Sequence, residues 1–418
     1  MTRISSKKNF DSEWAPVTLP DIIGDNGLFV DGDWIESKDQ DPNGEVRLIQ
    51  LADIGDGDFR NKSSRFLTLR RALEIKCTFL AEGDILLARM PDPLGRACIF
   101  PLKGERKFVT AVDVAIIRAN NKKVNSKFLL YTINNPTYRR MIEDLESGTT
   151  RKRISRKNLS TIPFSLPSIG IQNQIVSKIE ELFSELNKGI ETLKLAQQQL
   201  KVYRQSVLKW AFVNDSFEKS NLNDVTNKIQ IGPFGTQLHK EDYVENGIPL
   251  INPTHIKAGK IVADTSFSIL KSKRDSLPNY ILEQGDVIMG RRGEMGRCGL
   301  VTTKETGWFC GTGSLYFRPN KEKVNEIFLY YYLCSQPVKK YLDDNAGGTT
   351  MANLNLKIVN DIPISLPTIQ EQVKIVQSVE SSLTIADKME ESINQSLQQS
   401  EALRQSILKR AFEGKLVK

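Results

Sequence analysis

The chain has 418 residues, of which 58 are lysine or arginine and 50 are aspartate or glutamate, giving a formal net charge of +8. This length allows two or three domains with sizeable cores, and the basic balance favours a polyanionic partner. Five scattered cysteines without a C-x-x-C pair argue against a disulfide framework and against a zinc site. The N-terminal stretch lacks the apolar core of a signal peptide, and the longest apolar run, "IFLYYYLC", is too short to cross a bilayer, so we expect a cytoplasmic protein.

The first predicted domain covers residues 14–147. Its short β-like runs, "VRLIQLADI", "GDILLAR" and "VAIIRA", are bounded by turn residues, and one or two helices are expected around 128–146. Basic, turn-rich loops lie between the runs, at 60–66, 88–96 and 103–107. We therefore predict an α+β domain with a mixed or antiparallel sheet.

The segment 148–212 predicts a long helix. It begins after Pro167, has no internal proline and would be roughly 60 Å long over about 40 residues. The part of the segment before the helix, "RKRISRK" at 151–157, is strongly basic. It suits contact with a phosphate backbone and predicts salt-sensitive DNA binding. Apolar or small residues recur in alternating steps of three and four, as in a heptad seam: Ile179, Leu182, Leu186, Gly189, Leu193, Ala196, Leu200, Tyr203, Val207 and Trp210.

The second half of the chain repeats the first. Segment 148–212 aligns without a gap on 348–412, with 25 identities in 65 positions, and "RQSVLKWAF" returns as "RQSILKRAF". A second α+β domain lies before this repeat, with a helical stretch around 326–344 and loops at 232–242 and 290–297. The seam of the second helix has fewer apolar residues, because serines and glutamines replace some of them. It keeps Val379, Leu383, Ala386, Met389, Ile393, Leu403 and Ile407.

The duplication predicts an architecture. Two similar α+β domains would be separated by two long antiparallel helices that form a coiled coil with an approximate two-fold relation. A coiled coil that only joins two copies of the chain is the simpler alternative for the seam. The predicted boundaries are 1–147, 148–212, 213–347 and 348–418.

Candidate DNA-contacting residues gather in the loops and where the first domain meets its helix. Arginine, glutamine, asparagine and histidine can form forked hydrogen bonds to base edges, whereas lysine mainly meets phosphate. The loops occupy matching places in both domains but differ in their letters, as expected if two domains read two different sequences. A solvated surface is the simpler interpretation of any single basic loop. The candidates are Lys62, Arg65, Arg89, Arg96, Arg106, Lys107, Thr150, Arg151, Lys152, Arg153, Gln237, His239, Lys240, Asn252, Arg291, Arg292, Arg297 and Thr350.

The sequence contains only weak catalytic signals. "NPTY" at 135–138 approaches the N-P-P-[YF] loop of amino-methyltransferases but lacks the second proline, so a turn that interrupts a helix explains it better. Asp21, Glu36 and Lys38 fit a loose nuclease pattern that would hold magnesium, but they lie in a polar region where chance matches are common. The chain has no phosphate-binding G-x-x-x-x-G-K-[ST] motif and only two histidines. We therefore expect no catalytic residue and no metal site.

Several motifs together resemble the specificity subunit of type I restriction-modification systems. They are "GTTRKRISRKNLSTIPFSLP", "GPFGTQLHKEDYVENGIPLINPTHI", "GDILLARMPDPLGRACI", "RRGEMGR" and "RQSILKRAFEGKLV", and the resemblance extends from about Trp14 onward. It implies that 1–147 and 213–347 are target-recognition domains, each reading half of a bipartite site in double-stranded DNA. It also implies that 148–212 and 348–418 are helical spacer regions that set the distance between the half-sites.

The resemblance further implies that the chemistry belongs to partner proteins. Two methyltransferase subunits would carry S-adenosylmethionine and modify adenines, and motor-nuclease subunits would use ATP and magnesium to cut unmodified DNA. The chain itself would be non-catalytic and without cofactors. Arg204, Phe212, Arg404 and Phe412 at the helix ends are candidates for docking the methyltransferase subunits, with packing against the opposite domain as the alternative. The rival functions are a stand-alone nuclease and a coiled-coil adaptor that does not touch DNA.

Overall fold

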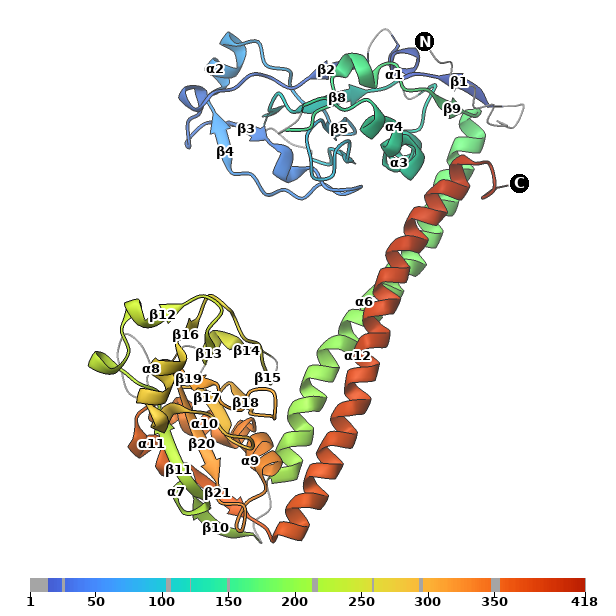
Figure 1. Cartoon of the computed structure of the whole chain (residues 1–418). Helices are drawn as coiled ribbons and strands as arrows, with labels where there is room; N and C mark the ends of the chain where they lie inside the picture. Colours follow the sequence, from blue (N-terminus) through green and yellow to red (C-terminus); the bar gives the residue numbers. More distant parts are fainter. Residues whose placement is uncertain are drawn as a thin grey trace, which may run out of the picture. The chain divides into compact units, whose positions relative to one another are not determined.

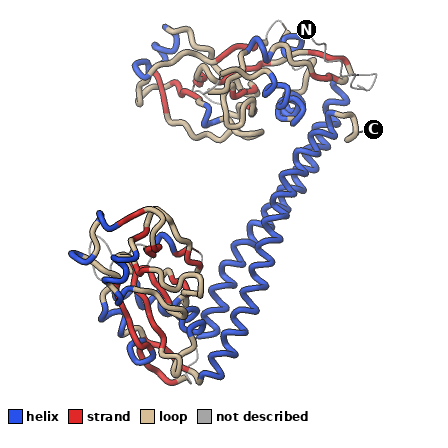
Figure 2. The backbone as a smooth tube through the Cα atoms, viewed as in Figure 1, coloured by secondary structure: helices blue, strands red, loops and turns tan. Residues whose placement is uncertain are grey.

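The computed structural model describes residues 14–24, 27–102, 107–120, 122–148, 151–212, 217–257, 259–292, 296–346 and 354–417. The chain divides into two compact units, Met1–Leu193 with Gln395–Lys418 (unit 1) and Lys194–Asn394 (unit 2). Each unit contains one domain of helices and strands, which we call a head, and a part of each of the two long helices (Figures 1 and 2). No helix among these residues is both long enough and apolar enough to span a membrane.

Two sheets form the head of unit 1. One is antiparallel with strand order β2-β8-β5-β6, and the other has the order β4-β3-β7, in which β3 and β7 are parallel. The strands are β2 (Leu28–Asp31), β3 (Val46–Ile49), β4 (Arg65–Leu67), β5 (Ile85–Ala88), β6 (Ala97–Ile99), β7 (Lys107–Thr110) and β8 (Val114–Arg118). The helices are α1 (Leu19–Ile23), α2 (Leu69–Glu74), α3 (Ser126–Asn134), α4 (Pro136–Asp144) and α5 (Arg156–Leu159).

The central strand β5 is apolar along its whole length because both of its faces are buried. Ile85 and Leu87 point into a core that includes Phe128 of α3, whereas Leu86 points into a second core with Phe108 of the other sheet. Successive side chains of a strand alternate between its faces, so a strand between two cores reads as one continuous apolar run.

The head of unit 2 repeats this plan. Its antiparallel sheet has the order β11-β20-β17-β18, and a second sheet has the order β12-β16-β13-β19 with β13 and β19 parallel. The strands are β11 (Thr226–Ile231), β12 (Tyr243–Val244), β13 (Ile248–Ile251), β16 (Ser268–Ile269), β17 (Val287–Gly290), β18 (Cys298–Leu300), β19 (Phe309–Cys310) and β20 (Ser314–Pro319), with a hairpin of β14 (Ile256–Lys257) and β15 (Lys260–Ile261). The helices are α7 (Leu222–Val225), α8 (Lys271–Ser276), α9 (Glu326–Leu333), α10 (Gln336–Asn345) and α11 (Leu356–Asn360). The predicted α+β class is confirmed.

The predicted helical stretches in the heads are present, each as two helices. Asn135 ends α3 and starts α4, with its side chain accepting a hydrogen bond from Thr137 N at 2.7 Å, and Ser335 is the N-cap position of α10 after α9. "NPTY" is therefore the helix-interrupting turn that we preferred. Six short helices were not predicted, because helices of four to six residues span too few turns to show a period; they are α1, α2, α5, α7, α8 and α11.

Two helices of 44 residues, α6 (Ile169–Phe212) and α12 (Ile369–Phe412), pair in antiparallel fashion as predicted. In unit 2, Gln197 meets Asn394 at 3.3 Å and Arg204 meets Glu390 at 2.9 Å, so positions rise along α6 while they fall along α12. In unit 1, Arg404 donates a hydrogen bond to the side chain of Asn187.

Part of the predicted seam is wrong. Tyr203, Trp210 and Met389 are exposed, whereas Arg204 and Ala211 are partly or fully buried beside the partner helix. A strict heptad needs helices that coil to 3.5 residues per turn, whereas a straighter helix of 3.6 residues per turn drifts one position along. Toward the end of α6, the more buried residue is therefore the one that follows the predicted position, as with Arg204 after Tyr203 and Ala211 after Trp210. Gly189 and Leu403, also predicted in the seam, are exposed for the same reason.

A buried glutamine fixes the start of each long helix to its head. The Gln172 side chain accepts a hydrogen bond from Asn125 N at 2.8 Å and donates to the carbonyls of Pro167 and Lys123 at 2.8 and 3.2 Å. Gln372 makes the same three contacts 200 residues later, with Asn325 N and the carbonyls of Pro367 and Lys323. Two-stranded ribbons of β1 (Ala15–Val17) with β9 (Phe164–Leu166) and β10 (Glu218–Asn221) with β21 (Pro363–Leu366) complete the joints.

Replacing Gln172 with leucine should loosen the joint of unit 1. Three backbone groups lose their partner, one in a buried and two in partly buried hydrogen bonds, which should destabilise the helix start by about 2–4 kcal/mol. Hydrogen exchange should accelerate across 122–130 and 167–175 but not across 322–330. Leucine in place of the exposed neighbour Gln174 is the matched control and should leave exchange unchanged.

The repeated nonapeptide ends each helix inside a head. The Phe412 ring packs edge-on against Phe128 of unit 1, with centroids 5.2 Å apart, and the Phe212 ring packs in the same way against Phe328 of unit 2. Each helix therefore ends against the head that it does not start from. The two copies of the nonapeptide have nearly the same sequence because they fill two equivalent packing sites.

Candidate nucleic-acid interface

In the head of unit 1 (head 1; that of unit 2 is head 2), a buried carboxylate binds the backbone of the loop 60–66. Asp53, at the end of the 3-10 turn Leu51–Asp53, accepts hydrogen bonds from Lys62 N at 2.6 Å and Ser63 N at 2.8 Å, and also from the Ser63 hydroxyl. Arg47 of β3 donates to the Asn61 side chain at 2.5 Å and to the Ser63 carbonyl at 2.7 Å. The loop backbone is thus fixed before any ligand arrives.

The side chains that this loop presents to solvent are basic. Lys62 and Arg65 are both exposed, and Arg65 lies on the short edge strand β4. A fixed backbone that displays exposed cations suits contact with phosphates and base edges, because little conformational freedom is lost on binding. Lys107, a third candidate, is exposed and places its ammonium 5.2 Å from the centre of the Phe79 ring.

Arg96 has a structural position that the sequence did not indicate. It is only 5% exposed, and its guanidinium donates to the carbonyl oxygens of Ile54 at 2.7 Å and Leu51 at 2.9 Å. Two further donations go to Pro93 at 3.0 Å and Met90 at 3.3 Å. The expectation that Arg96 itself contacts DNA is therefore replaced: its donors are used inside the head, where they tie the loop 88–96 to the turn at Leu51.

Arg297 repeats this arrangement in head 2. Its guanidinium lies 3.3 Å from the Pro253 carbonyl and 3.4 Å from the Ile256 carbonyl, which are the counterparts of Leu51 and Ile54. The matching glycines, Gly95 and Gly296, both have positive φ, at 76° and 74°. One frame therefore supports the loops in both heads.

Arg89 and Arg153 form part of an ion cluster where head 1 meets its helix. Arg89, 6% exposed, donates to Asp31 at 2.5 Å, and Arg153 pairs with Asp113. Burial lowers the pKa of the Arg89 guanidinium, and Asp31 opposes that effect. Arg156 lies 3.7 Å from Asp31 and donates to the Phe29 carbonyl at 2.7 Å. Arg89 is thus mainly structural, whereas Arg153 remains partly exposed.

The rest of the junction is open to solvent. Arg151 and Lys157 are exposed, and Lys152 forms an exposed ion pair with Glu146 at 2.6 Å. An exposed ion pair contributes little to stability, so its lysine remains available to a polyanion. The predicted basic patch is therefore present on the described surface of unit 1.

Head 2 presents a different set of side chains. His239 and Lys240 are exposed at the start of the 3-10 turn Lys240–Asp242, and Phe234 and Gln237 are exposed just before them. The side-chain oxygen Oε1 of Gln237 accepts a hydrogen bond from the Tyr280 hydroxyl at 2.7 Å, which orients the side-chain amide.

The remaining candidates of head 2 lie near the loop 290–297. Arg292 is exposed, whereas Arg291 is buried, and Asn252 accepts a hydrogen bond from Gly313 N at 3.3 Å. Arg291 therefore corresponds to Arg89 in both sequence and burial. Arg106, Thr150 and Thr350 lie outside the described residues.

The nuclease candidates serve local structure. Asp21 accepts hydrogen bonds from Thr18 N and its hydroxyl, both at 2.7 Å, and those bonds hold the pKa of Asp21 below its ordinary value. Glu36 and Lys38 pair with each other at 2.5 Å. The described part of the chain contains no group of three or more His, Cys, Asp or Glu residues placed to hold a metal ion. Burial raises the pKa of Cys77 and Cys98 to about 12, so both remain thiols.

The residues proposed for partner docking are engaged within the chain. Phe212 and Phe412 pack in the heads as described above. Arg204 pairs with Asp387 at 2.6 Å and Glu390 at 2.9 Å, and Arg404 lies 4.5 Å from the centre of the Phe183 ring. The contacts of Phe212 and Phe412 match the alternative of packing against the opposite head, whereas Arg204 and Arg404 contact the other long helix. The docking role stays a prediction.

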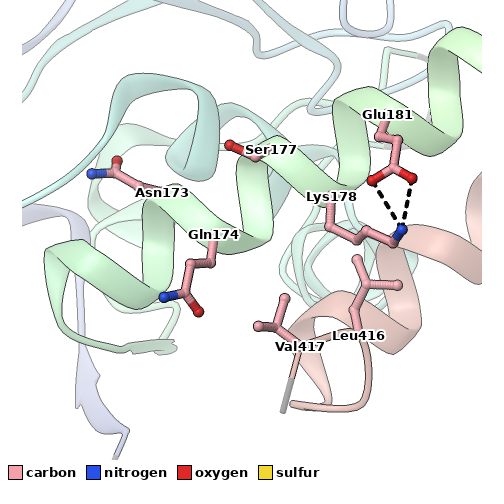
Figure 3. A pocket seen from close by; sticks show the side chains of 7 residues that line it. All are labelled: Asn173, Gln174, Ser177, Lys178, Glu181, Leu416 and Val417. Atoms are coloured by element: carbon pink, nitrogen blue, oxygen red, sulfur yellow. Dashed lines mark hydrogen bonds and ion pairs between the residues drawn. The ribbon is translucent and has the colours of Figure 1, made fainter.

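A hollow in unit 1 lies between the start of α6 and the tail after α12 (Figure 3). Its volume is about 580 Å³, and its lining residues are Asn173, Gln174, Ser177, Lys178, Glu181, Leu416 and Val417. Lys178 and Glu181 pair at 2.8 Å, so the charged side chains of the lining neutralise each other. That lining does not suit a phosphate group.

The residues that support the loops and the helix starts were not predicted from the sequence. Asp53, Arg47 and the glutamines Gln172 and Gln372 hold backbone groups, and none of them belongs to a basic cluster. The 200-residue offset was the available signal for the glutamines, since "Q" recurs at 172 and 372 within otherwise variable letters.

Comparison with known proteins identifies relatives over most of the chain. The family model described as "Type I restriction modification DNA specificity domain" matches residues 11–195 and 214–399. The specificity subunit of the type I restriction enzyme EcoBI from Escherichia coli is 24% identical over 327 residues, covering 72% of this chain and 68% of that protein. The MjaVIII specificity subunit from Methanocaldococcus jannaschii is 22% identical over 352 residues, covering 80% and 79%.

Solved structures share the fold. The HsdS subunit from Thermoanaerobacter tengcongensis has a TM-score of 0.59 at 16% identity, covering 99% of this chain and 100% of that one. A chain from a structure of type I R-M system assembly and conformational transition has a TM-score of 0.72 at 18% identity, covering 98% and 100%.

Proposed function

Because the chain belongs to the type I restriction-modification DNA specificity family and is the non-catalytic recognition subunit of such a system, we propose that each head reads one half of a bipartite DNA site. The observation that carries this proposal is that both heads hold equivalent loops with the same arginine–carbonyl contacts but expose different side chains. Arg96 and Arg297 hold equivalent loops, while the exposed residues that the structure describes in those loops differ, with Asp92 and Pro93 in one and Arg292 in the other. Two readers of one design with different contact residues suit two different half-sites.

The long helices are proposed to set the unread spacer between the half-sites. Each has 44 residues and would be about 66 Å long at 1.5 Å per residue. The buried glutamines fix both helix starts to the heads, and the packed phenylalanines fix both ends. A helix that is anchored at each end can act as a spacer of defined length.

Type I specificity subunits work with methylase and restriction subunits and bind DNA, and we assign the same partners to this chain. We propose two methyltransferase subunits, one for each half-site, that carry S-adenosylmethionine and methylate adenine. Motor-nuclease subunits would supply ATP hydrolysis and magnesium-dependent cleavage. We place the complex in the cytoplasm, and the five free thiols support a reducing compartment.

Mixing the purified chain with its methyltransferase, labelled S-adenosylmethionine and duplex libraries tests the function. We expect adenine methylation in two short motifs separated by a fixed spacer, only when both proteins are present. Cleavage of DNA by the chain alone with magnesium would instead support the nuclease alternative. If the mixture of both proteins methylated adenines without any preference for sequence, recognition of DNA by this chain would be contradicted.

The basic junction should set part of the salt dependence of DNA binding. Replacing Arg151 and Lys157 with glutamine removes two exposed cations, so the slope of log affinity against log salt should fall by about 1.8, at 0.9 per lost phosphate contact. Gel shifts over a salt series measure this slope. Glutamine in place of the exposed helix residue Lys201 is the control, and an equal fall there would contradict a specific role for the junction.

A further inference from the structure

Two cysteines of head 2 lie in contact with each other. Cys298 is the first residue of β18, and Cys334 directly follows α9, which packs beside that strand (Figure 1). Both side chains belong to one apolar core, in which Cys298 is 3% exposed and Cys334 is partly exposed. The two thiols hydrogen-bond to each other. We call these two residues the thiol pair.

The corresponding positions of head 1 are also in contact, through different chemistry. Cys334 corresponds to Asn134 at the 200-residue offset. Cys298 corresponds to Ala97, because each directly follows the arginine that holds the loop carbonyls. The Asn134 amide accepts a hydrogen bond from Ala97 N at 3.0 Å and donates one to the Ala97 carbonyl at 2.9 Å. Arg139 also donates to the Asn134 amide oxygen at 2.8 Å, so Asn134 connects α3 to β6 and to α4.

A thiol cannot replace that amide. A carboxamide offers a strong donor and a strong acceptor, whereas a thiol is weak in both roles. Two thiols in contact can instead form a covalent bond when an oxidant removes two electrons from them. The same helix and strand are therefore connected by hydrogen bonds in head 1 and carry an oxidisable pair in head 2.

The two thiols differ in the way that stepwise oxidation requires. The hydrogen bond from Cys298 lowers the pKa of Cys334, and the ammonium of Lys339 and the hydroxyl of Tyr330 act in the same direction against the effect of burial. Lys339 is the counterpart of Arg139 at the 200-residue offset. Burial raises the pKa of Cys298. Because the thiolate is the nucleophile, the partly exposed Cys334 is the sulfur that reacts first with an oxidant.

We propose that the thiol pair is a peroxide-sensitive modification site, at which a disulfide forms between β18 and α9. The Cys334 thiolate attacks one oxygen of hydrogen peroxide; the O–O bond breaks, and a sulfenic acid and hydroxide result. The Cys298 thiol then attacks the sulfur of that sulfenic acid, so the S–S bond forms and the S–O bond breaks with loss of water. The proton that Cys334 had released neutralises the hydroxide. Two thiols and one peroxide thus give one disulfide and two molecules of water.

The modification affects one head only. Head 1 carries asparagine and alanine at these positions, and its two cysteines, Cys77 and Cys98, lie in different cores. The third cysteine of head 2, Cys310, lies in a core apart from the thiol pair. In a reducing compartment the pair stays as thiols, so the bond forms only when peroxide is present. The disulfide then supplies a connection between helix and strand where head 1 uses an amide.

Peptide mass spectrometry of the full-length chain tests the proposal, after treatment with dilute hydrogen peroxide and alkylation under denaturing conditions. We expect linked peptides that contain Cys298 and Cys334 in most chains, and we expect dithiothreitol to separate them. The cysteines Cys77, Cys98 and Cys310 should remain thiols and carry the alkyl group. The test needs neither DNA nor a methyltransferase, so its outcome is independent of the proposed function.

Hydrogen exchange measures the structural effect of the bond. Oxidation should slow exchange across 296–301 and 326–334 by about tenfold or more, because the disulfide opposes local opening of strand and helix. Exchange across 95–100 and 126–134 of head 1 should not change. Cys334→Ser should abolish both the linked peptides and the response to peroxide. Combining Cys298→Ala with Cys334→Asn copies head 1 and is the matched control, which should fold and show the same exchange with and without peroxide.

Three outcomes would overturn the proposal. The first is oxidation of Cys334 to a sulfinic acid without any linked peptide. The second is a disulfide between two copies of the chain, which electrophoresis without reductant detects. The third is equal exchange in the linked and the reduced chain, since the bond would then not connect β18 to α9 in the folded head.

Discussion

Adding one heptad to both long helices should lengthen the DNA spacer that the complex accepts and leave both half-sites unchanged. The insertions belong after Leu193 in α6 and after Asn394 in α12, because both helices pass from one unit to the other at these points. Seven residues make close to two turns and add about 10 Å, so the spacer should grow by up to about three base pairs at 3.4 Å each. The buried faces of both helices keep their register.

Mapping of methylated adenines in cells that carry the variant and its methyltransferase measures this change. An insertion in α6 alone is the control: it shifts the pairing of one helix against the other and should abolish methylation. Methylation at the original spacing by the double insertion would contradict the spacer role.

Replacing Arg96 with alanine should unfold the reading surface of head 1 without affecting head 2. The change removes the guanidinium donor from the carbonyl oxygens of Leu51, Ile54, Met90 and Pro93, of which Leu51 and Pro93 keep a backbone donor, and opens space where a guanidinium was buried. We expect a local loss of about 3–5 kcal/mol, since buried acceptors keep their desolvation cost when their partner is removed. Hydrogen exchange should accelerate across 47–66 and 85–97, and binding to the first half-site should fall at least 100-fold.

The exposed Arg65 is the matched control for this experiment. Arg65→Ala should weaken DNA binding more modestly and leave hydrogen exchange in the head unchanged. Arg297→Ala should produce the corresponding loss in head 2 alone. If Arg96→Ala lowered DNA affinity while hydrogen exchange stayed at the wild-type rate, Arg96 would contact DNA directly. Its assigned role of tying the loop 88–96 to the turn at Leu51 would then be wrong.

The sequence predicted the large-scale organisation because duplication and apolar periodicity both extend over many residues. The gap-free match of 148–212 to 348–412 placed both long helices and both joints. The same periodicity misplaced Tyr203, Trp210 and Met389, since a 3.5-residue period and a 3.6-residue period differ by little over one turn but diverge along a helix of 44 residues.

The candidate site was only partly predictable. The exposed cations Lys62, Arg65 and Arg151 were found by composition, because solvated basic residues cluster in loops. The roles of Arg96 and Arg89 were not predictable, since a sequence does not distinguish an arginine that binds backbone carbonyls inside a head from one that faces solvent. Asp53 was missed because its partners, Lys62 N and Ser63 N, are backbone groups that any residue provides.

Exchange of head 1 for that of another specificity subunit tests the central claim most directly. A chain in which residues 14–147 come from a relative would be expressed with its own methyltransferase, and methylated adenines would be mapped across the genome. Two independent readers predict that one half-site changes to that of the donor while the other half-site and the spacer persist. A change in both half-sites, or in neither, would contradict the account.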